Sequence, residues 1–215
     1  MWQTVSKFTQ SVSLPLTPVQ VQTLADYAQL VWQKKDMLNL TSVSGLEEIL
    51  RRHICDGLQG AAWAQSWAKH HARDTFDVID AGSGAGYIGL TWAVALPQAR
   101  VTLVESLEKR CAFLNWTVLK LNLKNISVKN IRLGEQKDLQ TDVLTERAMG
   151  QLPDILPICL QAVKPGGVFV AYQGETVPPV DAAKYGAVQG TVQKYTLPSD
   201  EKARQLVCFE KRAYE

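Results

Sequence analysis

One short segment of the chain combines an acidic residue with closely spaced glycines, Asp80-x-Gly82-x-Gly84-x-Gly86. An apolar run precedes it, which predicts a turn between a strand and a helix. Glycines in such a turn let the backbone approach a ligand closely and adopt positive φ angles. The segment therefore predicts a cofactor site that includes Asp80, Gly82, Gly84 and Gly86.

Two classes of cofactor fit this segment. The pattern Gly84-x-Gly86-x-x-Gly89, with Glu105 nineteen residues after Gly86, is typical of dinucleotide-binding proteins. S-adenosylmethionine (SAM) has a cationic sulfonium and a free α-amino group, which Asp80 would favour. The same carboxylate would disfavour a pyrophosphate at the helix N-terminus. The spacing favours SAM, with Glu105 holding the ribose hydroxyls, and an NAD-binding oxidoreductase is the alternative.

The segments around this turn alternate between strand and helix. Apolar runs predict strands at 76–80, 101–105, 126–130, 143–145 and 168–172. Helices are predicted to end near residue 96 and to cover 107–121 and 152–163, and two later runs, 191–197 and 205–209, suit an antiparallel ending. This alternation predicts an α/β protein with a doubly wound, mainly parallel sheet.

The first part of the chain is predicted to be helical. Thr17-Pro18-Val19-Gln20 and Ser44-Gly45-Leu46-Glu47 both read as capping boxes that begin helices. No convincing strand precedes residue 76. We therefore expect residues 1–72 to form an N-terminal helical lobe and residues 73–215 to form the cofactor-binding domain.

The composition excludes several classes of protein. The chain has 215 residues, 46% hydrophobic and 20% charged, which is ordinary for a globular protein and unlike a disordered or fibrous chain. Its four cysteines form no CxxC pair and only three histidines accompany them, which argues against a metal site and a disulfide framework. The N-terminal segment lacks the features of a signal peptide, and no run reaches the roughly 18 apolar residues of a membrane span. We expect a cytoplasmic protein without metal or membrane segment.

Positive charge is concentrated in residues 100–132, where seven basic residues accompany two acidic ones. A localised basic stretch in a near-neutral chain suits contact with a polyanion, although a solvated helix face would give the same pattern. We expect phosphate contacts along a helix that lies away from the cofactor pocket, from Lys109, Arg110, Lys120 and Lys124.

Several separate motifs together resemble a known family. They are Asn39-Leu40-Thr41-Ser42, Arg52-His53-Ile54-x-Asp56, the glycine turn, Glu105-Ser106-x-x-Lys109-Arg110-x-x-Phe113-Leu114, Arg147-Ala148 and Lys164-Pro165-Gly166-Gly167. Over about residues 20–175 the combination resembles the bacterial 16S ribosomal RNA guanine-N7 methyltransferases, also called the glucose-inhibited division protein B family. The resemblance implies a fold of the class I SAM-dependent methyltransferase type. It also implies methyl transfer to N7 of a guanine in 16S ribosomal RNA or the small ribosomal subunit.

The resemblance further implies roles for individual residues. The family's cofactor contacts correspond to Gly82, Tyr87, Leu133, Gly134 and Arg147. Its substrate and catalytic pocket corresponds to Asn39, His53, Arg132 and Arg147.

The chain departs from the family pattern at several positions. Ile88 stands where the family usually has proline, and Gly134 where it often has an acid, with Glu135 as a possible substitute. Gln173 and Gln205 replace a lysine and a histidine. The change at Gln173 removes one expected cationic contact to a phosphate or base.

The implied reaction needs few catalytic groups. Guanine N7 has a free lone pair and no proton, so its attack on the SAM methyl requires no general base. Catalysis would come mainly from alignment of the reacting atoms. Methylation of a small molecule or a protein, and a SAM-binding protein that transfers nothing, are alternatives on the same fold. We expect the protein to act as a monomer.

Overall fold

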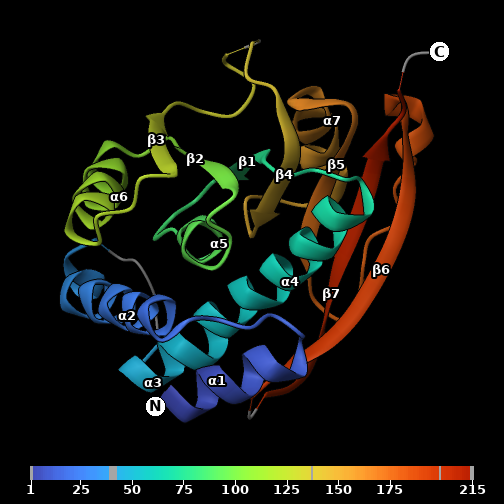
Figure 1. The fold of residues 1–215 in the computed structure, drawn as a ribbon. Coiled ribbons are helices and arrows are strands. Elements are labelled where there is room, and N and C mark those ends of the chain that lie inside the picture. The colour runs from blue at the N-terminus through green and yellow to red at the C-terminus, as the bar shows by residue number, and fades with distance from the viewer. Residues whose placement is uncertain (1, 39–42, 137, 199, 214–215) are drawn as a thin grey trace.

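The computed structural model describes residues 2–38, 43–136, 138–198 and 200–213. Within them the chain forms a sheet of seven strands in the order β3-β2-β1-β4-β5-β7-β6 (Figure 1). The strands are β1 (Phe76–Ala81), β2 (Ala99–Glu105), β3 (Ile126–Asn130), β4 (Thr141–Arg147), β5 (Val163–Gln173), β6 (Ala187–Leu197) and β7 (Asp200–Lys211). The first five are parallel, and β7 is antiparallel to both β5 and β6. The predicted mainly parallel sheet with an antiparallel ending is confirmed.

The order of the strands brings three acidic residues to the carboxyl ends of neighbouring parallel strands. β1 pairs with β2 on one side and with β4 on the other, so Asp80 lies opposite Leu103 and Thr145. Glu105 and Glu146 come at the carboxyl ends of β2 and β4. Ligands of open parallel sheets bind outside the carboxyl ends of the strands, next to the point where the strand order reverses.

Helices cover the two faces of the sheet unequally. One face carries α4 (Cys55–His70), α5 (Gly89–Ala95) and α6 (Glu108–Lys120), and the helices α1 (Trp2–Ser11) and α2 (Pro18–Leu38) join the same apolar core. The other face carries α7 (Leu152–Gln161) and the short 3₁₀-helix η2 (Ala182–Tyr185). Helices on both faces make the sheet doubly wound, as predicted.

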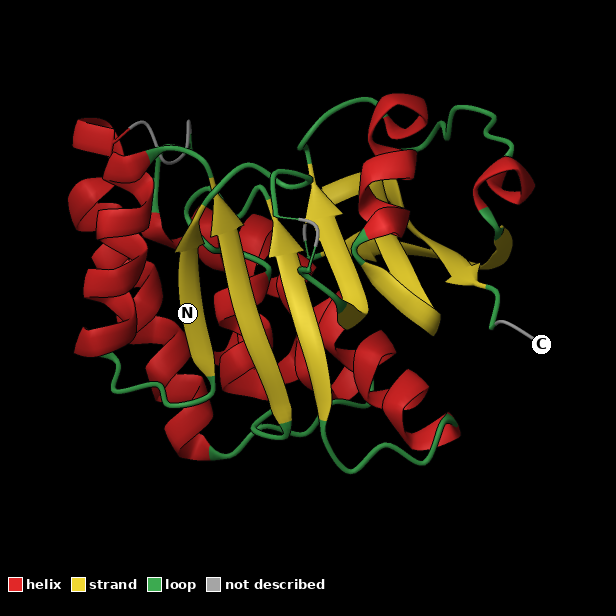
Figure 2. Cartoon of the chain, turned by 90° about the horizontal axis from the view of Figure 1, so that it is seen from above, coloured by secondary structure: helices red, strands yellow, loops and turns green. Residues whose placement is uncertain are grey.

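The second face is open over the first three strands. β3 continues to β4 through residues 131–140, whose described part contains no helix. Figure 2 looks onto this face and shows α7 beside bare strands. Thr102 is partly exposed there and Ser127 is exposed. Polar residues on one side of these strands are therefore explained by contact with solvent.

The N-terminal helices begin largely where the sequence indicates. Gln20 Oε1 accepts the backbone N–H of Thr17 at 2.9 Å, which is the predicted capping box at the start of α2. The second capping box uses Glu48 instead of Glu47, because Glu48 Oε2 accepts the N–H of Ser44 at 3.0 Å before α3 (Leu46–Ile49). A π-helical stretch, η1 (Leu50–Ile54), then leads into α4. The boundary at residue 72 stays a prediction.

The structure differs from the predicted elements in three smaller respects. Helix α1 has no counterpart among the predicted elements. Helix α7 ends at Gln161, and the motif 164–167 lies inside β5, where the pairing with β4 shifts register. Gly166 has a φ of 76°, which lets the chain bulge out of the strand instead of forming a separate turn before it. No helix in the described part of the chain is long and apolar enough to cross a membrane.

Candidate functional site

Two adjoining hollows lie at the carboxyl ends of β1, β2 and β4. Their volumes are about 320 and 300 Å³, and both are lined by Gly82, Arg110 and Ala148. The first hollow is also lined by predicted site residues from four segments, His53, Asp80, Gly84, Tyr87 and Arg147. The second is also lined by Glu105, Leu107, Arg132, Leu133 and Met149. The structure thus brings most of the predicted site residues together in one elongated cleft.

The glycine turn forms the floor shared by the two hollows. Gly82 and Gly84 have φ angles of 66° and 60°, and the N–H of Gly82 donates to the Val104 carbonyl at 2.9 Å. A Cβ on Gly84 would meet only the Gly82 carbonyl, at 3.9 Å, so the turn leaves open space there. A Cβ on Gly82 would lie 3.0 Å from Met149 Cγ, which shows that the Met149 side chain lies over this glycine.

Gly86 packs against neighbouring helices and does not line the cleft. Its φ is 88°, and a Cβ at this position would lie 2.6 Å from Leu90 Cδ1 and 2.8 Å from Leu114 Cδ2. Neither hollow is lined by Gly86. The third glycine of the motif is therefore required by close packing of the turn on α5 and α6.

Two buried carboxyl groups lie at the strand ends, on opposite faces of the sheet, and only that of Asp80 lines the cleft. Asp80 is only 2% exposed, and its Oδ2 accepts the backbone N–H of Gly89 at 3.0 Å. Burial raises the pKa of Asp80 to about 7, because it outweighs this hydrogen bond. Burial likewise raises the pKa of Glu146 to about 7, although Glu146 Oε2 accepts the N–H of Met149 at 3.1 Å. A cation in the first hollow would favour the ionised form of Asp80.

Glu105 is held in the second hollow by the backbone. Its Oε2 accepts the N–H of Gly84 and its Oε1 the N–H of Leu107, both at 2.9 Å. The side chain is 5% exposed. A carboxylate has about four acceptor positions, so these two bonds fix its orientation and leave lone pairs for hydroxyl groups of a ligand. This arrangement fits the predicted contact to a ribose.

Arg147 is the centre of a buried polar network. Its Nη1 lies 2.7 Å from Oδ2 of Asp56, which is 1% exposed. The hydroxyl of Tyr195 donates to Asp56 Oδ1 at 2.6 Å, and Arg204 Nη1 lies 3.7 Å from Asp56 Oδ2. The β6–β7 hairpin therefore contacts, through Asp56, the arginine that lines the first hollow.

His53 packs against Tyr87 in the same hollow. The two rings are stacked with centroids 4.1 Å apart and planes inclined by 25°. Arg147 Nη2 lies 3.4 Å from His53 Nδ1, and the guanidinium is 5.4 Å from the Tyr87 ring centroid. Loss of hydration and the nearby arginines lower the pKa of His53 to about 3. The imidazole is therefore neutral near neutral pH, and its acidic imidazolium form is not populated there.

The remaining predicted residues lie in the second hollow, in a separate cavity or outside the described residues. Leu133 is buried and Arg132 is exposed at the second hollow. Gly134 lines a separate cavity of about 120 Å³ beside Ile158 of α7. Asn39 falls outside the described residues.

The sequence reasoning missed several residues of the site. Arg110, expected on a helix face away from the pocket, lines both hollows, and its Nη1 is 3.9 Å from Glu105 Oε2. Its place in the first turn of α6, directly after β2, was the available signal. Met149, Tyr195 and Arg204 carry no local motif, and Tyr195 lies 139 residues from its partner Asp56.

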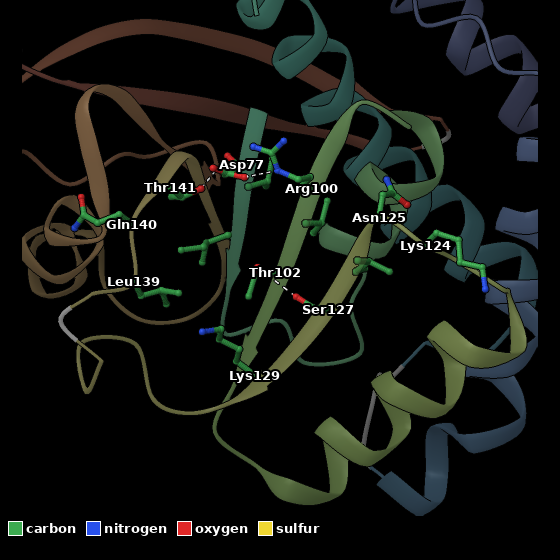
Figure 3. A pocket seen from close by; sticks show the side chains of 14 residues that line it. Asp77, Arg100, Thr102, Lys124, Asn125, Ser127, Lys129, Leu139, Gln140 and Thr141 are labelled. Atoms are coloured by element: carbon green, nitrogen blue, oxygen red, sulfur yellow. Dashed lines mark hydrogen bonds and ion pairs between the residues drawn. The ribbon is translucent and has the colours of Figure 1, made fainter. Parts of the chain in front are cut away.

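A cavity of about 470 Å³ lies at the opposite end of the strands (Figure 3). It occupies the open sheet face and is lined by Asp77, Arg100, Thr102, Ser127 and Lys129, among others. Arg100 and Lys164 pair with Asp77 at 2.7 and 2.8 Å. No predicted cofactor or catalytic residue that the structure describes lines this cavity, although Lys124, predicted to contact phosphates, does. The one acidic side chain among its described residues, Asp77, is already paired with cations, so they offer no free acid for a cationic ligand, and the cleft at the carboxyl ends is the candidate site.

The described residues contain no group of three or more side chains arranged to hold a metal ion. The cysteines Cys55, Cys111, Cys159 and Cys208 are buried and free. Burial raises the pKa of Cys55 to about 12, so its thiol is protonated and unreactive.

Comparisons with solved structures support the fold. The chain is similar to a methyltransferase from Pyrococcus furiosus, with a TM-score of 0.52, 14% identity and coverage of 72% of this chain and 84% of that one. It is also similar to the methyltransferase yhhF of Escherichia coli, with a TM-score of 0.53, 16% identity and coverage of 72% and 86%. At such identities the likeness shows the sheet and helix arrangement of methyltransferases and nothing finer.

Comparisons of sequence are more specific. The chain is 30% identical to ribosomal RNA small subunit methyltransferase G of Lachnoclostridium phytofermentans, over 94% of this chain and 86% of that protein. It is 32% identical to the protein of the same name from Limosilactobacillus reuteri, over 92% and 86%. The model of the rRNA small subunit methyltransferase G family matches residues 20–207. The chain therefore belongs to the rRNA small subunit methyltransferase G family.

Proposed function

We propose that this protein transfers a methyl group from SAM to N7 of a guanine in 16S ribosomal RNA. Its family is that of small-subunit ribosomal RNA methyltransferases, and the cleft at the carboxyl ends of β1, β2 and β4 has the groups that this reaction needs. The observation that carries the proposal is the placement of two acidic side chains at the open glycine turn, with the buried Asp80 lining the first hollow and Glu105 lining the second. Such a site favours a cationic ligand over an anionic one.

The residues present fit SAM as the cofactor. Asp80 would hold the α-amino group, and the open space above Gly84 would admit the methionine end. Glu105 would accept the ribose hydroxyls, and Leu107, Leu133 and Arg110 would border the rest of the nucleoside. When bound, SAM supplies an electrophilic methyl group on a sulfonium centre. A dinucleotide fits less well, because its pyrophosphate would lie close to the carboxylate of Asp80.

The protein's own groups would bind and orient the substrate. Guanine N7 carries no proton, so the neutral His53 and the Arg147 guanidinium have a positioning role beside Tyr87 and need transfer no proton. Asp56 and Tyr195 hold Arg147 in place. Fixed alignment of the two reacting atoms can lower the barrier by about 7–11 kcal/mol. The target base must leave its stack to enter such a cleft.

The partner in this proposal is 16S ribosomal RNA, free or within the small ribosomal subunit. The names of the related proteins point to this substrate. The proposal includes a monomeric enzyme that works in the cytoplasm, where ribosomes are assembled.

A methyl-transfer assay tests this proposal. The protein is incubated with SAM labelled in its methyl group and with small subunits or 16S ribosomal RNA that lack the modification. Nucleoside analysis should find the label as 7-methylguanine at one position. Label on another base, on ribosomal protein or on a small molecule would contradict the proposed substrate. Binding of NAD without binding of SAM would contradict the proposed cofactor.

A further inference from the structure

An apolar groove lies between α2 and α6, beside the cleft but not part of it. It has a volume of about 390 Å³ and is lined by Met37, Leu38, Ala112, Phe113 and Trp116, with Lys34 and Lys109 among its residues. Figure 1 shows the two helices side by side, near the end of the sheet where α6 follows β2. Met37 is 69% exposed, although it is a large apolar side chain. A large apolar side chain with this exposure, at the rim of an apolar groove, is typical of a surface that binds a partner.

The charged side chains that line the groove are both lysines. Neither Lys34 nor Lys109 forms an ion pair with any described acidic residue. Lys34 Nζ lies 5.7 Å from the centroid of the Trp116 ring, so its present partner is an aromatic face. Asp36, the acid nearest to Lys34 in sequence, pairs with Lys35 at 2.6 Å. A protein ligand could neutralise these lysines only if it had acidic side chains at the matching positions. An RNA ligand carries a negatively charged phosphate at every nucleotide.

The groove is also next to the catalytic cleft. Lys109 lines the groove, and the following residue, Arg110, lines both hollows of the cleft. A single strand that leaves the cleft across the first turn of α6 would therefore reach the groove directly. Aromatic side chains combined with lysines are how proteins bind single-stranded nucleic acid, with bases stacked on rings and phosphates near cations.

We propose that the α2–α6 groove binds an unstacked base of the RNA next to the methylated nucleotide. Trp116 provides the stacking surface, Met37 and Leu38 form the apolar wall, and Lys34 and Lys109 contact the flanking phosphates. This inference rests on the proposed function, because it assigns a subsite to the same RNA substrate.

Comparing an RNA strand with its abasic counterpart isolates the stacking contact. Wild-type protein and Trp116→Leu are titrated with a short single-stranded RNA of mixed sequence and with the same RNA lacking bases. Wild type should bind the normal strand about 5- to 150-fold more tightly than the abasic one. Trp116→Leu should lose most of this difference, and Trp116→Phe should retain it. SAM affinity should be unchanged in all variants.

Met37→Glu provides a second variant that does not depend on a buried ring. Met37 is exposed, so the variant should fold, yet its carboxylate would repel a phosphate in the groove. Val19→Glu is the matched control, because Val19 lies on the same helix and is 74% exposed. Met37→Glu should weaken RNA binding several-fold and Val19→Glu should not. Lys109→Gln should reduce the salt slope of binding by about 0.7.

The outcomes separate this inference from the proposed function. If wild type methylates 16S ribosomal RNA but Trp116→Leu and Met37→Glu bind RNA as wild type does, the groove is not an RNA subsite and the proposed function stands. If Met37→Glu instead separates a dimer of the wild-type protein, the groove is a contact between copies, which also overturns the inference. If wild type neither binds RNA nor transfers methyl groups, both proposals fail.

Discussion

Strand β1 carries one aspartate near each end, and the two have opposite surroundings. Asp77, at the amino end, is partly exposed and receives hydrogen bonds from Arg100 at 2.7 Å and Lys164 at 2.8 Å. Partial burial acts to raise its pKa, but these cations outweigh that effect and lower it. Asp80, three residues on, is buried, and burial raises its pKa to about 7. The aspartate at the amino end of the strand is thus paired with two cations, whereas the aspartate at the carboxyl end has no cation paired with it among the described residues.

This difference distinguishes structural charges from functional ones. At the amino end, Asp77, Arg100, Lys164 and Asp142 neutralise each other and need no ligand. At the carboxyl end, Asp80 lines the cleft but forms no ion pair with any described residue, because the neighbouring Arg147 is engaged by Asp56. Buried groups with shifted pKa values in a cleft mark functional sites. The volume of a single cavity would favour the amino end, whereas the unpaired Asp80 favours the carboxyl end.

The largest effect is expected from removal of Arg147. Arg147→Ala leaves the buried Asp56 without its nearest cation and should lower the free energy of unfolding by about 3–5 kcal/mol. Methyl transfer should fall to background. At the other end, Arg100→Ala removes a more exposed partner and should cost about 0–1 kcal/mol. Chemical denaturation of both variants measures the contrast, and equal losses would mean that the two ends do not differ as described.

A smaller effect is expected at Glu105. Glu105→Gln keeps one acceptor oxygen but loses the charge, and should weaken SAM binding by about 1–3 kcal/mol. Glu108→Gln is the matched control, because Glu108 is an exposed acid three residues later. Calorimetric titration with SAM gives both affinities. If Glu105→Gln binds SAM as tightly as the control does, the ribose contact must be assigned to another residue.

The affinity for SAM should change gradually with pH. The raised pKa of Asp80 means that its neutral form is favoured in the folded protein, whereas a cationic amino group needs the ionised form. Affinity should therefore rise with pH up to the region above about 7, and fall by up to about tenfold for each unit below it. Asp80→Asn should flatten this profile. A wild-type affinity that is constant between pH 5.5 and 8 would remove Asp80 from the cofactor site.

The sheet and its connections were predictable because their signals are local. The strand 126–130 and the start of α2 at Thr17-Pro18 are fixed by apolar periodicity and by a capping box. Helix α1 was missed, since no capping signal precedes residue 2. The boundary of β5 was also missed, because the bulge at Gly166 depends on pairing with β4, which the sequence of the motif does not reveal.

The site was predictable where one motif carries several residues. Asp80, Gly82 and Gly84 come from one turn, and the family resemblance added His53, Tyr87 and Arg147, all of which line the first hollow. Tyr195 and Arg204 could not be predicted, because their link to Asp56 exists only after the antiparallel hairpin has folded against α4. Arg110 was expected away from the pocket but lines both hollows, since sequence shows that a helix is basic but not which of its residues turns toward the strand ends.

Calorimetric titration of SAM into wild type, Asp80→Asn and Asp77→Asn at pH 8 compares the two ends of strand β1 in one experiment. The two substitutions make the same chemical change on the same strand and differ only in the end of the sheet that they affect. The account predicts that Asp80→Asn weakens SAM binding by about 10- to 150-fold, the loss of a hydrogen bond between charged groups, while Asp77→Asn binds within twofold of wild type. Equal affinities for the two variants, or a larger loss for Asp77→Asn, would contradict the assignment of the cofactor site to the carboxyl ends of the strands.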